Sequence, residues 1–213
     1  MRKLQLLLPG ALLAATLLQG CMPLAMVGAG AAVVSLEDRR TTGSQVEDRG
    51  IELRTRNRID DRYGDRVHVN VTSYNRYVLL TGEVHEEPAR AEIEKIARGV
   101  PNVLGVSNDL QVAGKSSMGS RSNDTYLTSK VKARFLDSGR INAIQVKVVT
   151  EAGVVYLLGV VTEKESEDAV EIARTTGGVR KVVKMFEYCK VEDEACRPRR
   201  KPTGDEPRAT PRS

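Results

Sequence analysis

The chain has 213 residues, of which 33 are lysine or arginine and 28 are aspartate or glutamate, so its formal net charge is +5. This length suits one domain of typical size or two small ones. Aromatic residues make up 4% of the chain and tryptophan is absent, which argues against a large aromatic core and against a broad aromatic platform for binding.

Residues 1–20 have the pattern of a secretory signal peptide. Met1-Arg2-Lys3 is a short basic start, residues 4–18 are nearly all apolar and uncharged, and the run closes on the small residue Gly20. This run is shorter than the ~20 residues that a membrane-spanning helix needs. Residues 4–36 together carry no charge, however, and are long enough to span a membrane if the signal stays uncleaved.

The segment Leu18-Gln19-Gly20-Cys21 resembles the bacterial lipobox, in which the signal is cut before a cysteine that carries a diacylglyceryl group. The leucine and the glycine match that motif, and Gln19 is a less usual occupant. The alternative is an ordinary signal peptide that contains a cysteine. The resemblance implies lipidation at Cys21 and anchoring by acyl chains, each buried methylene contributing ~0.8 kcal/mol. Met22, in place of an aspartate, implies the periplasmic face of the outer membrane.

Two segments lack apolar periodicity. Residues 21–43 begin with small and apolar residues and are expected to form a lipidated linker near the membrane. Residues 192–213 are rich in proline and arginine and are expected to form a disordered basic tail.

The chain contains an internal repeat. Residues 67–71 match residues 144–148, and Gly82 matches Gly159, both at a separation of 77 positions. Further along, residues 96–98 match residues 172–174 at a separation of 76 positions. One residue is therefore missing from the second copy, and we expect the gap in the loop at 87–90, since surface loops tolerate changes of length. Self-similarity at this period indicates two copies of one small domain.

The first copy, residues 44–113, predicts the order helix, strand, strand, helix, strand. Ser44 and Glu47 have the spacing of a capping box, and a charged, proline-free segment continues to about Tyr63. The other expected elements are strands at 67–71, 77–84 and 103–112, a turn at 73–75, and a helix after Pro88 that ends at Gly99. After a linker at 114–121, residues 122–191 repeat this order. The prediction is an α+β fold in which each small three-stranded sheet is covered by two helices.

This order, together with the lipobox, resembles the BON domain of bacterial envelope proteins, and more closely the dual-BON-domain outer-membrane lipoproteins. The residues that carry the resemblance are 38–48, 51–54, 78–80 with Gly82, and 122–131. It covers roughly residues 18–191. It implies that the second domain binds anionic phospholipid, such as phosphatidylglycerol, and nothing is transferred to residues 192–213.

The first helices of the two copies differ in charge. Residues 45–63 hold five acidic and five basic residues, which cancel, whereas residues 125–140 hold four basic residues and one acidic residue, a net of +3. The sequence segments that the two copies share are explained by their common fold. Residues that determine function are therefore expected where the copies differ.

In the second of these helices, an aromatic residue is in line with two cations. Tyr126, Lys130 and Arg134 recur every four residues beside a second stripe that is expected to face the core, Leu127, Val131 and Phe135. Tyrosine suits the headgroup level of a membrane, and cations attract anionic lipid. We interpret Tyr126, Lys130 and Arg134 as a lipid-binding site; the alternative is a solvated basic helix face.

Catalysis and nucleic-acid binding find little support. His68 is expected on the outward side of a strand and His85 at a strand end, both on the surface, so no metal site and no cofactor are expected. The serines at 116–120 lie in a linker and lack the pattern of a nucleophile elbow. An export signal and the lack of stacking aromatics argue against nucleic acid. The leading hypothesis is a non-enzymatic lipid-binding lipoprotein that supports outer-membrane integrity; the alternative is an adaptor that docks an envelope protein partner, with lipid only as tether.

Two further pairs are singled out. Gly82 and Gly159 are expected where a strand closely approaches a neighbouring element. Cys189 and Cys196 are expected to form a disulfide in an oxidising compartment, the alternative being free or intermolecularly paired thiols.

Overall fold

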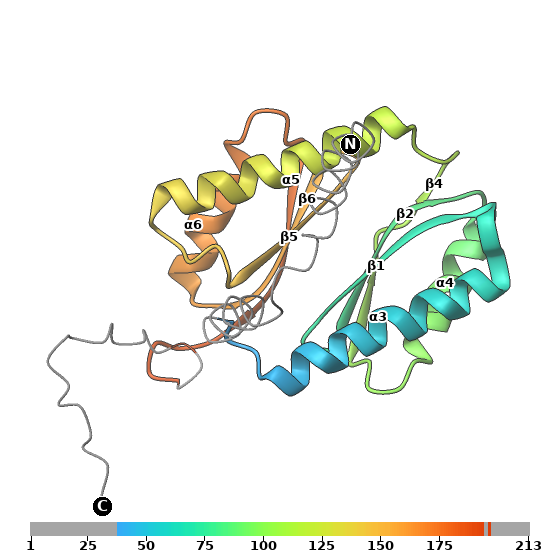
Figure 1. The fold of residues 1–213 in the computed structure, drawn as a ribbon, viewed down its shortest axis with the longest axis horizontal. Helices are drawn as coiled ribbons and strands as arrows, with labels where there is room; N and C mark the ends of the chain where they lie inside the picture. The colour runs from blue at the N-terminus through green and yellow to red at the C-terminus, as the bar shows by residue number, and fades with distance from the viewer. Residues whose placement is uncertain (1–37, 194–195, 197–213) are drawn as a thin grey trace, which may run out of the picture. The chain divides into compact units, whose positions relative to one another are not determined.

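The structure, a computed structural model, describes residues 38–193 and 196 (Figure 1). The predictions for the signal peptide, for Cys21 and for most of the linker and tail therefore fall outside the described residues. Within the described part, no helix is long and apolar enough to cross a membrane.

The first repeat has the predicted order of elements. They are α3 (Thr42–Tyr63), the 3-10 turn η2 (Gly64–Arg66), β1 (His68–Tyr74), β2 (Tyr77–Val84), α4 (Glu87–Arg98), β3 (Gly105–Asn108) and β4 (Gln111–Val112). Strand β2 pairs antiparallel with β1 and parallel with β3 and β4. Helices α3 and α4 cover one face of this sheet (Figure 1), and the buried side chains between them form the core.

The second repeat is built in the same way. Its elements are α5 (Met118–Ser138), β5 (Val146–Glu151), β6 (Val154–Val161), α6 (Glu163–Arg174) and β7 (Lys181–Tyr188). Strand β6 is again central, antiparallel to β5 and parallel to β7. The predicted α+β fold, with two helices over each small sheet, is confirmed.

The boundaries differ from the predictions at several points. Helix α3 begins one turn early because Thr41 is its N-cap and accepts a hydrogen bond from the Ser44 amide at 3.1 Å. Helix α5 begins at Met118 because Ser117 caps it, so the predicted linker 114–121 is helical in its second half. The predicted strand 103–112 is two short strands, β3 and β4, and Leu110 between them is buried in the core.

The missing residue of the second repeat lies between strand and helix. Two residues, His85 and Glu86, separate β2 from α4, whereas Thr162 alone separates β6 from α6. The gap therefore falls just before the predicted position at 87–90. Thr162 completes a capping box with Glu165, so the shorter loop still gives its helix a satisfied N-terminus.

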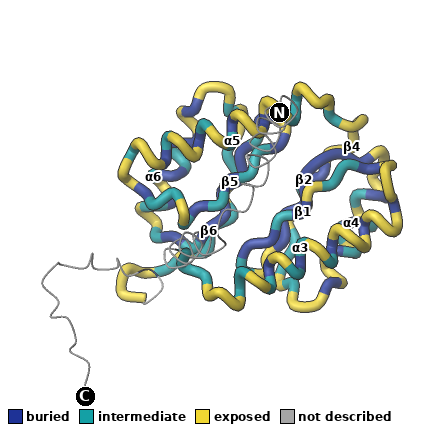
Figure 2. Tube along the Cα trace, viewed as in Figure 1, coloured by how far each residue is buried: buried dark blue, intermediate teal, exposed yellow. Residues whose placement is uncertain are grey.

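Buried residues follow the strands and the inner sides of the helices (Figure 2). Each repeat has a core of its own. A third cluster joins the two, with Tyr74 and Leu79 of the first repeat packed together with Tyr156 and Leu158 of the second. Both repeats belong to one compact unit that begins at Arg39.

Candidate functional site: the outer face of helix α5

The inner side of α5 is apolar and buried, as predicted. Leu127 is 2% exposed, and Val131 and Phe135 are fully buried. These side chains recur every four residues, and Val131 and Phe135 belong to the core of the second repeat, where α5 packs against β5 and α6. The remaining side chains of α5 are thereby oriented toward its flanks and toward solvent.

Tyr126 and Lys130 lie on the accessible side of α5. The Tyr126 side chain is an exposed aromatic group, with the residue 62% accessible. The Lys130 ammonium group lies 5.8 Å from the centre of the Tyr126 ring, within the range of a cation–π contact. It also donates a hydrogen bond to the carbonyl oxygen of Gly177 at 3.1 Å. The structure thus brings these two predicted site residues together.

Arg134 points elsewhere, toward the end of α6. Its guanidinium group donates to the carbonyl oxygen of Ile172 at 2.8 Å and to the hydroxyl groups of Thr175 at 3.1 Å and Thr176 at 2.8 Å. The last carbonyl groups of a helix lack partners within the helix and carry partial negative charge. Arg134 therefore has a structural partner, and sequence spacing alone did not indicate it.

Other side chains extend the accessible surface of α5. Leu136 is 69% exposed, and Lys132, Ala133 and Asp137 are also exposed. One side of the helix carries Tyr126, Ala133 and Leu136, because separations of seven residues and then three residues bring side chains to the same side. We call Tyr126, Lys130, Lys132, Ala133 and Leu136 the α5 outer face. Helical periodicity could have added Lys132 and Leu136 to the predicted site.

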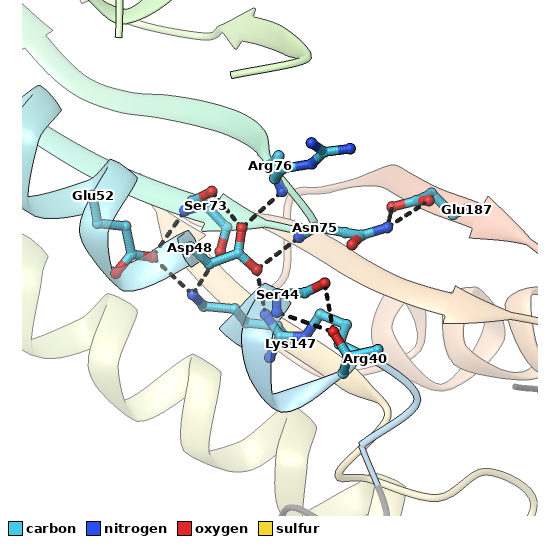
Figure 3. Close-up of polar contacts among 10 residues, drawn as sticks. Arg40, Ser44, Asp48, Glu52, Ser73, Asn75, Arg76, Lys147 and Glu187 are labelled. Atoms are coloured by element: carbon cyan, nitrogen blue, oxygen red, sulfur yellow. Dashed lines mark hydrogen bonds and ion pairs between the residues drawn. The ribbon is translucent and has the colours of Figure 1, made fainter. Parts of the chain in front are cut away.

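Acidic residues that the sequence interpretation missed anchor the β-hairpins. Asp48 of α3 is 3% exposed, and its carboxylate accepts hydrogen bonds from the amides of Asn75 at 2.8 Å and Arg76 at 2.7 Å (Figure 3). In the second repeat, Asp124 of α5 does the same for the amides of Ala152 at 2.9 Å and Gly153 at 2.8 Å. The two aspartates lie 76 positions apart, so the repeat itself was the available signal.

Polar contacts also join the two repeats. The ammonium group of Lys147 lies 3.0 Å from the Glu52 carboxylate, and the Asn75 amide group donates to the Glu187 carboxylate at 2.9 Å (Figure 3). The Arg39 guanidinium group binds the Glu165 carboxylate through two hydrogen bonds, at 2.6 and 2.8 Å. These contacts bring together residues that are far apart in the sequence.

The predicted glycines and cysteines are placed as follows. A Cβ atom at Gly82 would collide with the carbonyl oxygen of His68, and one at Gly159 would lie 2.6 Å from the carbonyl oxygen of Gln145. A disulfide joins Cys189 to Cys196, with the Cα atoms 6.1 Å apart. The disulfide closes a short loop that begins directly after β7.

One of the two histidines is only partly exposed, whereas a surface position was predicted for both. The His68 side chain is 20% exposed, and its Nδ1 atom lies 2.9 Å from the Glu83 carboxylate. Glu151 of the second repeat lies close to both. His85, by contrast, is exposed beside Glu86, as predicted. The sequence could not indicate the His68 cluster because its members come from three different strands.

Comparisons with known proteins agree with this architecture. The family model described as BON domain matches residues 47–114 and 123–190, one match in each repeat. The chain is 40% identical over 181 residues to the outer membrane lipoprotein DolP of Haemophilus influenzae, an alignment that covers 83% of this chain and 93% of that protein.

Two further relatives are more distant. The chain is 32% identical to the 21 kDa hemolysin of Actinobacillus pleuropneumoniae over 71% of this chain and 79% of that protein. It is 35% identical to the osmotically inducible protein Y of Escherichia coli over 54% of this chain and 58% of that protein.

Proposed function

Because the chain belongs to the BON-domain family, with one such domain in each repeat, we propose that it is a non-enzymatic lipoprotein that binds anionic phospholipid through α5 and supports outer-membrane integrity. Its similarity to an outer membrane lipoprotein over most of both chains supports a place in the bacterial envelope. Lipidation at Cys21, on the periplasmic side of the membrane, is part of the proposal.

The observation that carries the proposal is the composition of the α5 outer face. Tyr126 and Leu136 expose apolar groups on one side of the helix, and Lys130 and Lys132 flank them with positive charge. An apolar stripe bordered by cations is the pattern of a helix that lies at a membrane surface. Tyrosine adds a ring that prefers the level of the lipid headgroups.

The attraction is weak and suits a protein that is already anchored. Each lysine near an anionic surface contributes ~1 kcal/mol, so two lysines alone give only transient binding. Acyl chains at Cys21 would hold the domain near the headgroups and raise their effective concentration. Arg134 is not needed for this attraction, since its guanidinium group binds the end of α6.

Vesicle binding tests the proposal. The form lacking residues 1–21 should bind zwitterionic vesicles that contain phosphatidylglycerol and bind poorly to vesicles without it. Replacing Lys130 and Lys132 with glutamate should weaken binding by at least about 30-fold, because about 2 kcal/mol of attraction is lost and repulsion is added. Tyr126→Ala should also weaken binding. Co-sedimentation with the vesicles measures each effect.

The matched control changes the same charge on the sister helix. Arg49 and Arg56 of α3 are exposed. Replacing both with glutamate changes the net charge by the same amount as the α5 double variant, but vesicle binding should stay close to that of the unmodified chain. Arg134 stays unchanged in these variants, because its replacement would remove contacts with α6. Binding that ignores phosphatidylglycerol, or equal loss in both double variants, would contradict the α5 site and favour an adaptor that docks a protein partner.

A further inference from the structure

His68, Glu83 and Glu151 gather at the meeting point of the two repeats. His68 and Glu83 are opposite one another in the register of β1 and β2, so their side chains lie on the same face of the sheet. Glu151 is the last residue of β5 in the other repeat. One ligand atom from each of the three residues lies within 4.8 Å of the others.

Both carboxylates are nine-tenths buried. Glu83 is 7% exposed and Glu151 is 8% exposed. Glu83 accepts hydrogen bonds from His68 at 2.9 Å and from the Ser116 amide at 3.2 Å. Glu151 accepts them from the side chains of Asn70 at 2.7 Å and Thr81 at 3.3 Å. The side chains are thus held in place by neighbours, as the ligands of a metal usually are.

The cluster lacks a strong counter-charge. Among residues 38–193 and 196, no lysine or arginine forms an ion pair with Glu83 or Glu151. Two buried carboxylates are costly unless a positive charge lies between them. A proton on the cluster or a bound cation would supply that charge.

A polar cavity of about 420 Å³ adjoins the cluster. His68, Asn70 and Glu151 line it, together with Asp124 and Thr128. Arg56 and Arg121 also line the cavity. The guanidinium group of Arg121 donates to Ser116, and within the described residues neither arginine forms an ion pair with Glu83 or Glu151. The cavity has room for water molecules, which would complete the coordination of a metal ion and provide a path for its entry.

We propose that His68, Glu83 and Glu151 bind a divalent transition-metal cation, with Zn²⁺ as the best match. One imidazole nitrogen and two carboxylate oxygens are ligands that Zn²⁺ accepts, with water in the remaining position. Mg²⁺ and Ca²⁺ prefer sites made of oxygen atoms alone. In such a site the imidazole of His68 would be neutral and both carboxylates would be ionised, as metal ligands must be. The ion would then join the first repeat to the second.

Calorimetry on the full chain tests this site. The chain, purified in detergent without a histidine tag and freed of metal with EDTA, should bind one equivalent of ZnCl₂ and show no comparable response to MgCl₂. Loss of a partner that only supports a ligand lowers metal affinity by about 10- to 100-fold, so His68→Ala and Glu151→Gln should each lower it by at least about 100-fold. At a concentration 100-fold above its Kd, Zn²⁺ should raise the Tm of the unmodified chain by about 5 °C.

The other histidine supplies the matched control. His85→Ala removes an exposed histidine that also lies beside a glutamate, and it should leave the Zn²⁺ affinity unchanged. Glu151→Gln keeps the shape of the side chain, and its far-ultraviolet circular dichroism in EDTA should match that of the unmodified chain. Should a variant fail to fold, NMR of the unmodified chain decides, because Zn²⁺ should shift the ring resonances of His68 and leave those of His85 in place.

Three results would overturn the proposal. They are the absence of Zn²⁺ binding, binding that persists in both His68→Ala and Glu151→Gln, and loss of binding in His85→Ala alone. A Tm that rises on acidification in EDTA while Zn²⁺ has no effect would also overturn it, since a proton would then supply the positive charge.

Discussion

Gly82 and Gly159 occupy matching positions of β2 and β6, yet the structure constrains them differently. Gly82 has a φ of +112°, a conformation that other residues rarely adopt, and a Cβ atom there would also strike the carbonyl oxygen of His68. Gly159 lacks this conformation, and a Cβ atom there would lie 2.6 Å from the Gln145 carbonyl oxygen and 3.3 Å from the Val161 side chain. Two residues that look equivalent in the sequence therefore carry different constraints.

Alanine at these positions should separate the two constraints. Gly82→Ala should lower the free energy of unfolding by more than Gly159→Ala, because strained backbone alone costs about 1–3 kcal/mol before the steric clash is added. Gly114→Ala is the control, since nothing lies within 4 Å of a Cβ atom there, and it should change stability by less than about 0.5 kcal/mol. Urea unfolding followed by circular dichroism measures all three, and equal losses at Gly82 and Gly159 would contradict this ranking.

At the scale of elements, the first helix of each repeat holds its own β-hairpin. The turn residues Asn75 and Ala152 both have positive φ, at 47° each, and the turns leave backbone amides that need acceptors. Asp48 and Asp124 accept those amides from the neighbouring helix. Helix and hairpin are therefore positioned together, which sets the orientation of the α5 outer face.

Asp124→Ala should destabilise the second repeat. Two amides lose their acceptor, and an unsatisfied buried amide costs about 1–3 kcal/mol. Asp137→Ala, an exposed aspartate on the same helix, should have little effect. Amide hydrogen exchange measured by NMR distinguishes the repeats: protection should fall in β5, β6 and α5 of the Asp124→Ala variant. Unchanged protection there would show that the carboxylate does not hold the hairpin.

At the scale of the whole molecule, the segment before α3 ties the first repeat to the second. Arg39 binds Glu165 and also donates to the carbonyl oxygen of Val160 at 2.9 Å. Its neighbour Arg40 remains in the first repeat, 2.8 Å from Asp48 and over the ring of Tyr74. Arg39 and Arg40 belong to the segment 38–48, which carried part of the family resemblance, and their contacts reach both repeats.

The Arg39–Glu165 contact should make stability depend on pH. Burial opposes ionisation of Glu165, but hydrogen bonds from Arg39 and Thr162 outweigh it and hold the pKa below its ordinary value of 4.5. A lowered carboxyl pKa stabilises the folded state above the ordinary pKa, and this contribution disappears as pH falls through the lowered value. Arg39→Ala should therefore lower Tm at pH 7, and the difference from the unmodified chain should shrink below about pH 5.

The control is Arg49→Ala, which removes an exposed arginine of α3. Exposed charges contribute little to stability, so its Tm should follow that of the unmodified chain at every pH. Thermal unfolding measured from pH 7 to pH 3 compares the three proteins. A Tm difference for Arg39→Ala that stays constant over this range would show that Glu165 ionisation is not coupled to the contact.

The sequence by itself determined the duplication, the order of elements and the buried stripe of α5. Each depends on local patterns: alternation in strands, a four-residue recurrence in helices, and matching residues at a constant separation. The charge contrast between the first helices is equally local, and the hypothesis of a lipid-binding site on α5 rests on it. Tyr126 and Lys130 were placed correctly on its accessible side because helical geometry converts spacing into direction.

Only the tertiary structure decided which side chains of α5 contact other elements, and which residues from distant elements lie close together. Arg134 has the same spacing as Lys130, but the end of α6 happens to lie within its reach. His68 and Glu151 meet because two sheets, each with its own register, bring their ends together. Contacts of this kind depend on the packing of whole elements against one another, and no periodicity along the chain records that packing.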